Sequence, residues 1–391
     1  MNGAFTTRAG LHTAGFYAAM FGALGALLPF WPVWLEDWGL SPAEVGLYTS
    51  LGVAVRALAG LAFPVIADRL DQRRLTVFVL SLLGAVVYAA HVLIEDRAML
   101  LIATLLTGAA ISGIMPLGEA LGTGAAKARG FPYAHPRAIG SVAFLVANII
   151  VGVMIARTGA DAALWWAVAL LIATALLGLR HPGGGTLKGV KPPAMSEIYR
   201  LLTQPTFALF TAAAAFSLSS HAVYYAYGSV HWRSLGIGEG VIGALWAFSV
   251  AVEVAFMLAL GPWLIARLGP VGALAVSGLG GILRWGAMMF DPPLSVLWLL
   301  QMLHTASFVA GHLGAIAFIS AAVPERFGAS AQGAFMGLAG GLLTALGMSL
   351  AAVVYPAFGG MTYGIAVVMS AAGLVLALRL GHRWNGRELP L

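Results

Sequence analysis

The stretch GLYTSLGVAVRALAGLAFPVIADRL, from Gly46 to Leu70, is apolar along most of its length and ends just after an Asp-Arg pair. An α-helix needs about 20 apolar residues to cross the hydrocarbon core of a bilayer. A second stretch, GALWAFSVAVEVAFMLALGPWLIARL, from Gly243 to Leu268, is similar to the first. The VAV tripeptides of the two stretches lie 197 residues apart, half of the 391-residue chain. The pair predicts membrane-spanning helices arranged in an internal repeat.

The amino-acid composition is that of a polytopic membrane protein. Sixty per cent of the residues are apolar and 9% are Asp, Glu, Lys or Arg, whereas a soluble domain is about 25% charged. Apolar stretches run at residues 11–35, 44–66, 73–94, 98–124, 137–157, 162–180, 207–231, 240–265, 270–290, 293–322, 330–356 and 360–380. We therefore expect an all-α membrane protein with twelve transmembrane helices, surrounded by the lipid bilayer.

One polar segment interrupts the apolar stretches near the middle of the chain. Residues 181–205, HPGGGTLKGVKPPAMSEIYRLLTQP, are rich in Gly and Pro and basic. We interpret them as a cytoplasmic linker between an N-terminal six-helix half, residues 1–180, and a pseudo-symmetric C-terminal half, residues 206–391. Paired repeats with a site between them are typical of transporters.

The distribution of Lys and Arg predicts the orientation. If the N-terminus is cytoplasmic, the inner loops and tails carry 16 Lys and Arg, and the outer loops carry only Arg97, Arg157 and Arg233. Cytoplasmic loops are enriched in these residues, so both termini are expected in the cytoplasm, in a bacterial-type inner membrane. The first 15 residues hold one Arg and no cleavage signature, and no removable signal peptide is expected.

Several classes of function are excluded by missing motifs. The chain has no Cys, and no HExxH, GxSxG with triad partners or Walker A loop occurs, which argues against an enzyme and against a Cys-ligated metal. The net charge of +6 comes from short loops and not from one basic patch, so no nucleic-acid partner is expected. We expect no cofactor and no metal, and transport driven by an ion gradient.

A few ionisable residues fall inside the apolar stretches, where they are costly and are functional candidates by default. They are Arg56, Glu119, Glu253, Arg284, His221, His304 and His312. A carboxylate such as Glu253, buried near a cation, can load and release a proton, and histidines titrate in the same pH range. The structural alternatives are ion pairs for Arg56 and Arg284 and helix-bridging hydrogen bonds for the histidines.

One face of the seventh apolar stretch combines a histidine with aromatic residues. His221, Tyr224 and Tyr225 fall at positions i, i+3 and i+4 of a helix. Such a stripe forms either a packing surface or the lining of a cavity, and the histidine favours the cavity.

The loop after the second stretch carries the first resemblance to a known family. Asp68-Arg69-Leu70-Asp71-Gln72-Arg73-Arg74 resembles the loop of the major facilitator superfamily, with Pro64 and Asp71 at positions where that loop has glycine. The resemblance implies that Asp68 and Arg69 belong to a cytoplasmic gate.

The resemblance extends to the lactose permease branch of that superfamily. LPFWPVWL (Leu28–Leu35) is similar to the branch's first helix, and Glu119 and Arg137, the latter within HPRAIGSVAF, resemble its sugar-binding acid and arginine. Glu253, Arg284 and His304 resemble its binding and proton-coupling residues. One departure is Ser307, where the branch has a glutamate, so we expect Glu253 or a histidine to carry the proton.

The phenylpropionate permease family is more similar still. HAVYYAYGSVHW (His221–Trp232), VAVEV (Val250–Val254), ILRWGAM (Ile282–Met288) and LQMLHTASFVAGHLGAI (Leu300–Ile316) resemble its seventh to tenth helices. The resemblance to that family implies an aromatic carboxylate as the substrate. Arginines beside aromatic rings suit such a ligand. A sugar or nucleoside, held by Glu119 and stacked on a ring, remains an alternative.

The sequence thus predicts a proton-coupled symporter that imports a small organic solute, best an aromatic carboxylate, and that works as a monomer. The alternatives are a proton-antiport efflux transporter and a non-transporting membrane sensor. The residues expected to bind solute are Glu119, Arg137, His221, Tyr224, Tyr225, Arg56 and Arg284, and those expected to couple protons are Glu253, His304 and His312.

Overall fold

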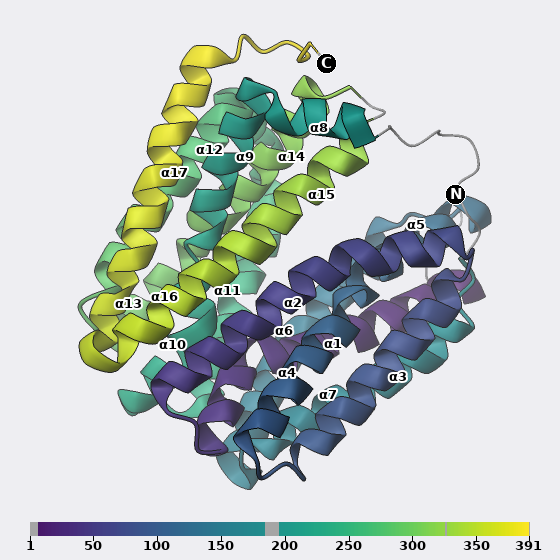
Figure 1. Ribbon diagram of the computed structural model, residues 1–391, viewed down its shortest axis with the longest axis vertical. Helices are drawn as coiled ribbons and strands as arrows, with labels where there is room; N and C mark the ends of the chain where they lie inside the picture. The colour runs from purple at the N-terminus through teal and green to yellow at the C-terminus, as the bar shows by residue number, and fades with distance from the viewer. Residues whose placement is uncertain (1–6, 184–194, 325–326, 391) are drawn as a thin grey trace. The chain divides into compact units, whose positions relative to one another are not determined.

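The structure describes residues 7–183, 195–324 and 327–390, and most of these residues are helical. The computed structural model contains no β-strand in these ranges (Figure 1). The chain divides into two compact units. One consists of Met1–Leu187 with Gly228–Ala247, and the other of Lys188–Tyr227 with Phe248–Leu391.

The predicted linker, residues 181–205, lies partly outside the described residues, which omit 184–194. Its described end forms α8 (Met195–Thr203), and α9 (Pro205–Ser219) begins directly afterwards. The segment Gly228–Ala247 follows the linker in the sequence but packs with the first unit. The division into halves of residues 1–180 and 206–391 stays a prediction.

The first unit is a bundle of long apolar helices. Its members are α1 (Arg8–Asp37), α2 (Pro42–Arg69), α3 (Arg73–His91), α4 (Arg97–Ser112), α5 (Ile114–Arg129), α6 (Ala134–Thr158), α7 (Asp161–Leu179), the end of α10 (Ala222–Ser234) and the beginning of α11 (Glu239–Ala259). Polar side chains mark where helices begin. Ser41 and Glu44 form a capping box at the start of α2, and Asp96 accepts a 2.9 Å hydrogen bond from the backbone N–H of Met99 in α4.

Small residues bring the helices of this unit close together. A Cβ added to Gly108 in α4 would lie 2.5 Å from the carbonyl oxygen of Gly52 in α2. This backbone-to-backbone approach is typical of membrane helices. Polar side chains also bridge helices, since the indole N–H of Trp34 in α1 donates to Oδ1 of Asp161 in α7 at 2.7 Å.

The second unit contains the remaining helices and two π-helical turns. In chain order after α9, α10 and α11 they are α12 (Gly261–Met288), α13 (Leu294–Met302), the π-helix η2 (Thr305–Ala310), α14 (Gly311–Ala322), α15 (Gly328–Gly337), the π-helix η4 (Leu338–Leu342), α16 (Leu343–Phe358), the 3₁₀ turn η5 (Gly359–Thr362) and α17 (Tyr363–Arg383). π-helical turns are rare and are frequent at functional sites.

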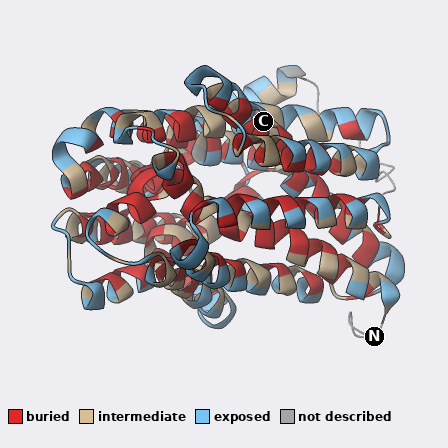
Figure 2. Cartoon of the chain, turned by 90° about the horizontal axis from the view of Figure 1, so that it is seen from below, coloured by how far each residue is buried: buried red, intermediate tan, exposed pale blue. Residues whose placement is uncertain are grey.

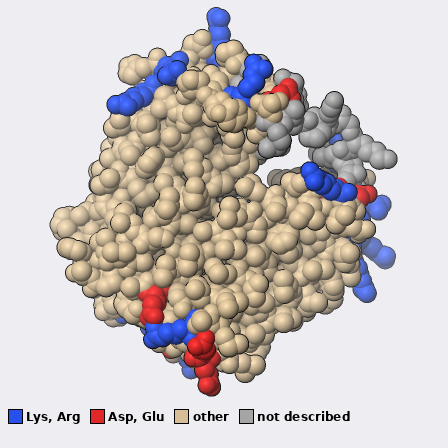
Figure 3. Space-filling model, viewed as in Figure 1, with Lys and Arg blue, Asp and Glu red and all other residues tan. Residues whose placement is uncertain are grey.

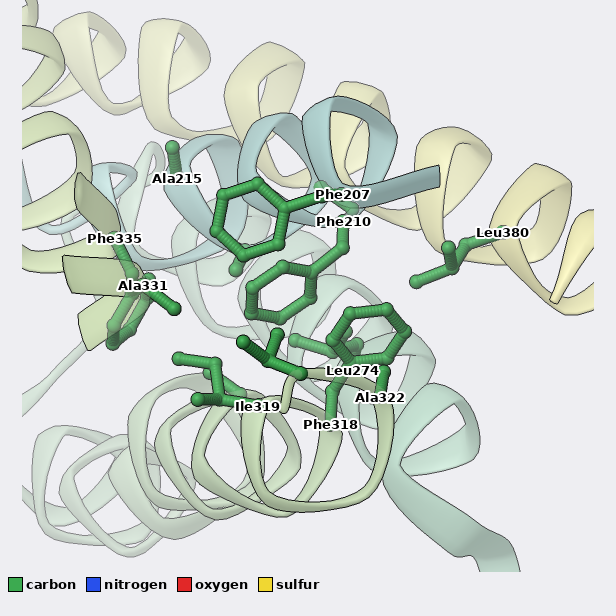
Figure 4. Close-up of a cluster of buried hydrophobic side chains, with 14 of the residues drawn as sticks. Phe207, Phe210, Ala215, Leu274, Phe318, Ile319, Ala322, Ala331, Phe335 and Leu380 are labelled. Atoms are coloured by element: carbon green, nitrogen blue, oxygen red, sulfur yellow. The ribbon is translucent and has the colours of Figure 1, made fainter. Parts of the chain in front are cut away.

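The core of the second unit is built around phenylalanine side chains (Figure 4). Phe210 of α9 stacks on Phe318 of α14 with ring centroids 4.1 Å apart, and Phe207 lies beside Phe210. Leu274 of α12 and Leu380 of α17 are buried in the same cluster. The cluster fixes α9, α12, α14 and α17 relative to one another and so provides a rigid support for side chains on α12.

The lengths of the helices agree with the predicted spans. Eleven helices among the described residues are long and apolar enough to cross a membrane, and the last of these, Ser330–Arg383, has 54 residues. At about 1.5 Å per residue that segment is far longer than one span. It turns at Gly359, where φ is 48°, a backbone conformation that favours glycine. Two spans result, as the twelve apolar stretches predict.

The surface is that of a membrane protein. Large apolar side chains such as Leu58 (72% exposed) and Val353 (77% exposed) face outward. In each unit the buried residues lie on the helix faces that meet other helices (Figure 2). Broad areas of the surface seen in Figure 3 carry no charged side chain. The predicted all-α membrane fold is confirmed.

Candidate functional site

A buried arginine organises the polar side chains of the second unit. Arg284 of α12 is fully buried. Its Nη2 donates to Oε1 of Gln301 at 2.5 Å, and its Nη1 donates to Nδ1 of His304 at 2.9 Å and to Oγ of Ser307 at 3.3 Å. Each of these acceptors is an uncharged group.

The three acceptors come from the junction of α13 and the π-helix η2. The acceptors are spaced three residues apart in the sequence. Gln301 lies at the end of α13, His304 directly precedes η2, and Ser307 lies within η2. Oγ of Ser277 in α12 donates to the carbonyl oxygen of Ser307 at 2.7 Å. A Cβ on Gly280 would lie 2.6 Å from Cβ of Ala306, so only a glycine lets α12 approach η2 this closely.

Aromatic rings surround the guanidinium. Cζ of Arg284 lies 5.1 Å from the ring centroid of Tyr224 and 4.5 Å from that of Trp285. The Trp285 ring stacks on Tyr363 with centroids 5.7 Å apart. Nε2 of Gln301 donates to the hydroxyl of Tyr224 at 3.0 Å. These contacts hold the cation against ring faces, where it is attracted by the ring quadrupoles.

The hydrogen bonds assign the tautomer of His304. Its Nδ1 accepts from Arg284, so Nε2 carries the hydrogen and donates to Oε2 of Glu253, 3.1 Å away. His221 approaches the same centre, with Nδ1 3.0 Å from the carbonyl oxygen of Leu218 and Nε2 3.5 Å from Nη1 of Arg284. Both histidines are therefore neutral, and a continuous chain of groups joins Arg284 through His304 to Glu253.

The charge of Arg284 is not directly compensated. Among the described residues it forms no ion pair with a carboxylate, and its buried Nε donor has no hydrogen-bond partner. A buried charge and a buried unmade hydrogen bond both cost free energy. The arrangement suits an anion-binding guanidinium, because a buried donor without a hydrogen-bond partner and a positive charge without an ion pair among the described residues lie at the same place.

A second polar cluster lies in the first unit. Nε of Arg137 in α6 donates to Oε1 of Glu119 in α5 at 2.7 Å. The hydroxyls of Tyr17 in α1, at 3.1 Å, and of Tyr133 donate to Oε2 of the same carboxylate. Cζ of Arg137 lies 4.1 Å from the ring centroid of Phe21. The structure thus brings together the predicted pair Glu119 and Arg137.

This cluster differs from the first in charge and exposure. Glu119 and Arg137 compensate each other, and their side chains are 31% and 32% exposed. A neutral, partly open pair of this kind offers hydrogen bonds to hydroxyl groups of a ligand but no net attraction for an anion.

Two further predicted residues lie at the edge of the Arg284 cluster. Tyr225 is half-buried, and its ring centroid lies 5.8 Å from that of His221. His312 of α14 stacks with Phe308 at 6.2 Å and is close enough to Glu253 to interact with it electrostatically.

Arg56 belongs to the first unit. Its side chain on α2 is exposed, and its described electrostatic neighbour is Tyr88.

The predicted gate residues lie at the turn from α2 to α3. Arg73 donates from Nε to Oδ1 of Asp68 at 2.5 Å, while Arg69 is exposed. Asp71 has a φ of 52°, in the left-handed region that glycine adopts without strain. This conformation explains why the loop of the resembling family has glycine there. The gating role of Asp68 and Arg69 stays a prediction.

Sequence reasoning missed Gln301, Tyr17, Phe21 and Tyr133. Gln301 could have been found, since it is a polar residue in an apolar stretch and lies three positions before His304. The other three carry no comparable signal, because aromatic residues are common in membrane helices and their partners lie far away in sequence.

A pocket of about 290 Å³ lies elsewhere in the first unit, beside Trp34, Trp38, Asp37 and Asp161. None of the predicted site residues lines it.

Comparison with known proteins decides the family. The model of the MFS_1-like family matches residues 11–365. The chain belongs to this family. It is 30% identical over 316 residues to a probable 3-phenylpropionic acid transporter of Escherichia coli K12, an alignment that covers 78% of this chain and 80% of that protein. The chain is also 29% identical over 339 residues to a maltose permease of Geobacillus stearothermophilus, covering 84% and 83%.

Solved structures of major facilitator transporters share the fold. A nucleoside transporter, NupG, superposes with a TM-score of 0.81 at 17% identity, covering 96% of this chain and 99% of that one. A D-xylose–proton symporter superposes with a TM-score of 0.64 at 15% identity, covering 96% of each chain. This MFS_1-like protein is therefore a multi-pass membrane transporter of the major facilitator superfamily and not an enzyme.

Proposed function

We propose that this transporter is a proton-coupled symporter that imports a small aromatic carboxylate. The observation that carries the proposal is Arg284, a fully buried guanidinium with an uncommitted Nε donor and no contacting carboxylate among the described residues. A carboxylate bound there supplies both the missing charge and the missing acceptor. The rings of Tyr224 and Trp285 beside the guanidinium suit an aromatic group on the same ligand.

The proposed proton-binding residue lies at the other end of the same chain of contacts. Glu253 contacts His304, which contacts Arg284, so a change of charge on Glu253 alters the electrostatic potential at the anion site. An importer that uses a proton gradient needs such a link between the two binding events. We propose Glu253 as the proton carrier, and His304 as the group between the two sites.

The names of relatives are compatible with two solute classes. A relative named for 3-phenylpropionic acid points to the carboxylate, whereas relatives named for maltose and raffinose point to sugars. The cluster of Glu119, Arg137, Tyr17 and Tyr133 is the observation that favours a sugar or nucleoside as the second candidate, because a compensated carboxylate accepts hydrogen bonds from ligand hydroxyls.

The direction of transport and the orientation in the membrane are part of the proposed function. We propose a monomer in the bacterial cytoplasmic membrane with both termini in the cytoplasm, which transports by alternating access. In the described conformation the guanidinium of Arg284 is covered by protein, so a solute reaches it only after covering side chains move. Efflux by proton antiport and a sensor without transport are the rival functions.

Binding and uptake by the full chain test the proposal. Isothermal titration of the detergent-purified protein compares 3-phenylpropionate with its neutral amide, with maltose and with uridine. We expect binding of the carboxylate and at least tenfold weaker binding of the amide. In proteoliposomes, a pH gradient that is acidic outside should drive accumulation of the carboxylate. If only maltose or uridine binds, the substrate is a sugar or a nucleoside and not a carboxylate. Accumulation under the opposite pH gradient would indicate an efflux transporter. Binding without flux would indicate a sensor.

A further inference from the structure

A second buried hydrogen-bond donor without a partner lies in the second unit, on Tyr363. This residue is the first of α17 and is 2% exposed. Its hydroxyl makes no hydrogen bond with any residue that the structure describes. Most buried polar groups in proteins are paired, because a buried hydroxyl without an acceptor costs free energy. The Tyr363 hydroxyl therefore resembles Nε of Arg284, the other buried donor that lacks an acceptor.

Trp285 lies against both of these side chains. Its ring stacks on the Tyr363 ring with an angle of 8° between the planes, and Cζ of Arg284 lies 4.5 Å from its centroid. The indole N–H donates to Oγ of Ser220 at 3.0 Å, and an indole offers no hydrogen-bond acceptor. The side chain that contacts both donors therefore satisfies neither of them.

The other neighbours of Tyr363 also leave its hydroxyl hydrogen without an acceptor. Its electrostatic neighbours among the described residues are Tyr224, Arg284, Tyr355 and Asp291. Three of them carry oxygen acceptors, on two hydroxyls and one carboxylate, yet the Tyr363 hydroxyl donates to none of these. The guanidinium of Arg284 has donors only. The hydrogen is thus available to an acceptor that a ligand brings to Arg284.

We infer that Tyr363 is a solute-binding residue, whose hydroxyl donates to the same carboxylate that binds Arg284. A carboxylate has two oxygens, which together accept about four hydrogen bonds, so one ligand group can pair both donors. The inference rests on the proposed function and adds to it a second residue that selects for the carboxylate group.

Two unpaired donors make such a site selective. A site built to hydrogen-bond a ligand strongly rejects an analogue that leaves its buried polar groups unpaired. The ligand-free protein bears the cost of the unpaired hydroxyl, and the bound carboxylate removes that cost. Deleting the hydroxyl should therefore change stability and affinity in opposite directions, which a purely structural tyrosine would not do.

Tyr363→Phe deletes the hydroxyl and keeps the ring that stacks on Trp285. The Tm of the ligand-free protein should be unchanged or raised, because an unpaired buried group is lost. The affinity for 3-phenylpropionate should fall about tenfold or more, as expected when a hydrogen bond to a charged group is lost. Thermal unfolding and isothermal titration of the full-length protein in detergent measure the two effects. In proteoliposomes, the KM for uptake driven by the pH gradient should rise by a similar factor.

Tyr48→Phe is the matched control. Tyr48 of α2 is 6% exposed, and its hydroxyl donates to the carbonyl oxygen of Arg97 at 2.9 Å. The control therefore deletes a buried hydroxyl that has a partner. Its Tm should fall because a hydrogen bond is lost, and its affinity for 3-phenylpropionate should equal that of the wild type.

The outcomes separate this inference from the proposed function. Unchanged affinity of Tyr363→Phe for 3-phenylpropionate would overturn the inference, while binding by the wild type would leave the proposed function in place. A lowered Tm or a failure of Tyr363→Phe to fold would also overturn it, because the hydroxyl would then be paired in the ligand-free protein. If the wild type does not bind 3-phenylpropionate, the proposed function itself is wrong.

Discussion

Oε1 of Gln301 accepts a hydrogen bond of 2.5 Å from Nη2 of Arg284, and both side chains are fully buried. Because glutamine is uncharged, this contact satisfies a donor of the guanidinium without cancelling its charge. The positive charge therefore stays available to a ligand. Gln301 thus keeps the proposed anion site without a permanent counter-ion.

Substitution at Gln301 separates its hydrogen bond from its lack of charge. Gln301→Glu places a permanent counter-ion on Arg284, so the affinity for 3-phenylpropionate should fall at least tenfold while thermal stability is kept or raised. Gln301→Leu removes the acceptor and should destabilise the fold by about 1–3 kcal/mol. Titration calorimetry and thermal unfolding in detergent measure both effects, with Gln332→Glu on the exposed face of α15 as the control. Unchanged affinity in Gln301→Glu would exclude Arg284 as the anion site.

Glu119→Gln discriminates between the two solute classes. The Glu119–Arg137 pair is about one-third exposed, so its loss should cost little stability, about 1 kcal/mol or less. If the ligand is a carboxylate held at Arg284, its affinity should change less than threefold. If the ligand is a sugar or nucleoside, its affinity should fall tenfold or more. Calorimetric titration of the variant with each compound distinguishes the two solute classes. If the affinity for every bound ligand is unchanged, the Glu119–Arg137 pair is a structural or gating element.

The turn between α2 and α3 contains a residue in a strained conformation. Asp71 has a φ of 52°, where a side chain costs free energy and glycine does not. Asp71→Gly should raise the free energy of unfolding by up to about 1 kcal/mol. Asp71→Ala keeps the Cβ and lacks the short polar side chain that makes aspartate tolerant of a positive φ, so it should lower the free energy of unfolding by a similar amount. Thermal unfolding of the two variants in one detergent measures the difference. Equal stability of the two would show that the turn relaxes around the side chain.

His181, after the end of α7, should make stability depend on pH. Burial lowers the pKa of His181 to about 3, with smaller contributions from His12 and Arg74. The folded pKa lies below the unfolded value of about 6.5, so the unfolded chain binds more protons between these values. Stability is therefore complete above about pH 6.5 and is lost as the pH falls towards 3.

The variant His181→Asn should weaken that dependence. Unfolding temperatures are measured between pH 4 and pH 8 for this variant, for the wild type and for His382→Asn, which changes an exposed histidine on α17. We expect a flatter profile only for His181→Asn. The same slope in all three proteins would assign the acid sensitivity to other groups.

The predicted orientation can be tested at the C-terminus. Because 16 Lys and Arg fall on the side of the termini and three on the other, alkaline phosphatase fused after Leu391 should be inactive and a fluorescent protein fused there should fluoresce. A fusion after Gly159, between α6 and α7, is the control and should be active as a phosphatase. The reverse pattern would contradict the orientation.

The boundaries of the helices show what hydropathy predicts well. The apolar stretches 44–66 and 137–157 correspond to α2 (Pro42–Arg69) and α6 (Ala134–Thr158). The agreement is good because a membrane helix must be apolar along its whole length. The interruptions inside spans, such as the π-helix Thr305–Ala310 and the kink at Gly269 with a φ of 64°, leave the hydropathy unchanged and could not be predicted.

The sequence by itself determined the class of fold and the short set of intramembrane ionisable residues, because both follow from the cost of placing polar groups in a bilayer. Only the tertiary structure decided which of them share a site. It joined Arg284 to His304, Glu253 and the unforeseen Gln301, and it joined Glu119 to Arg137 and two tyrosines. Hydrophobicity acts on each helix separately, whereas a hydrogen-bonded site depends on the rotation and packing of several helices, which no single stretch of sequence specifies.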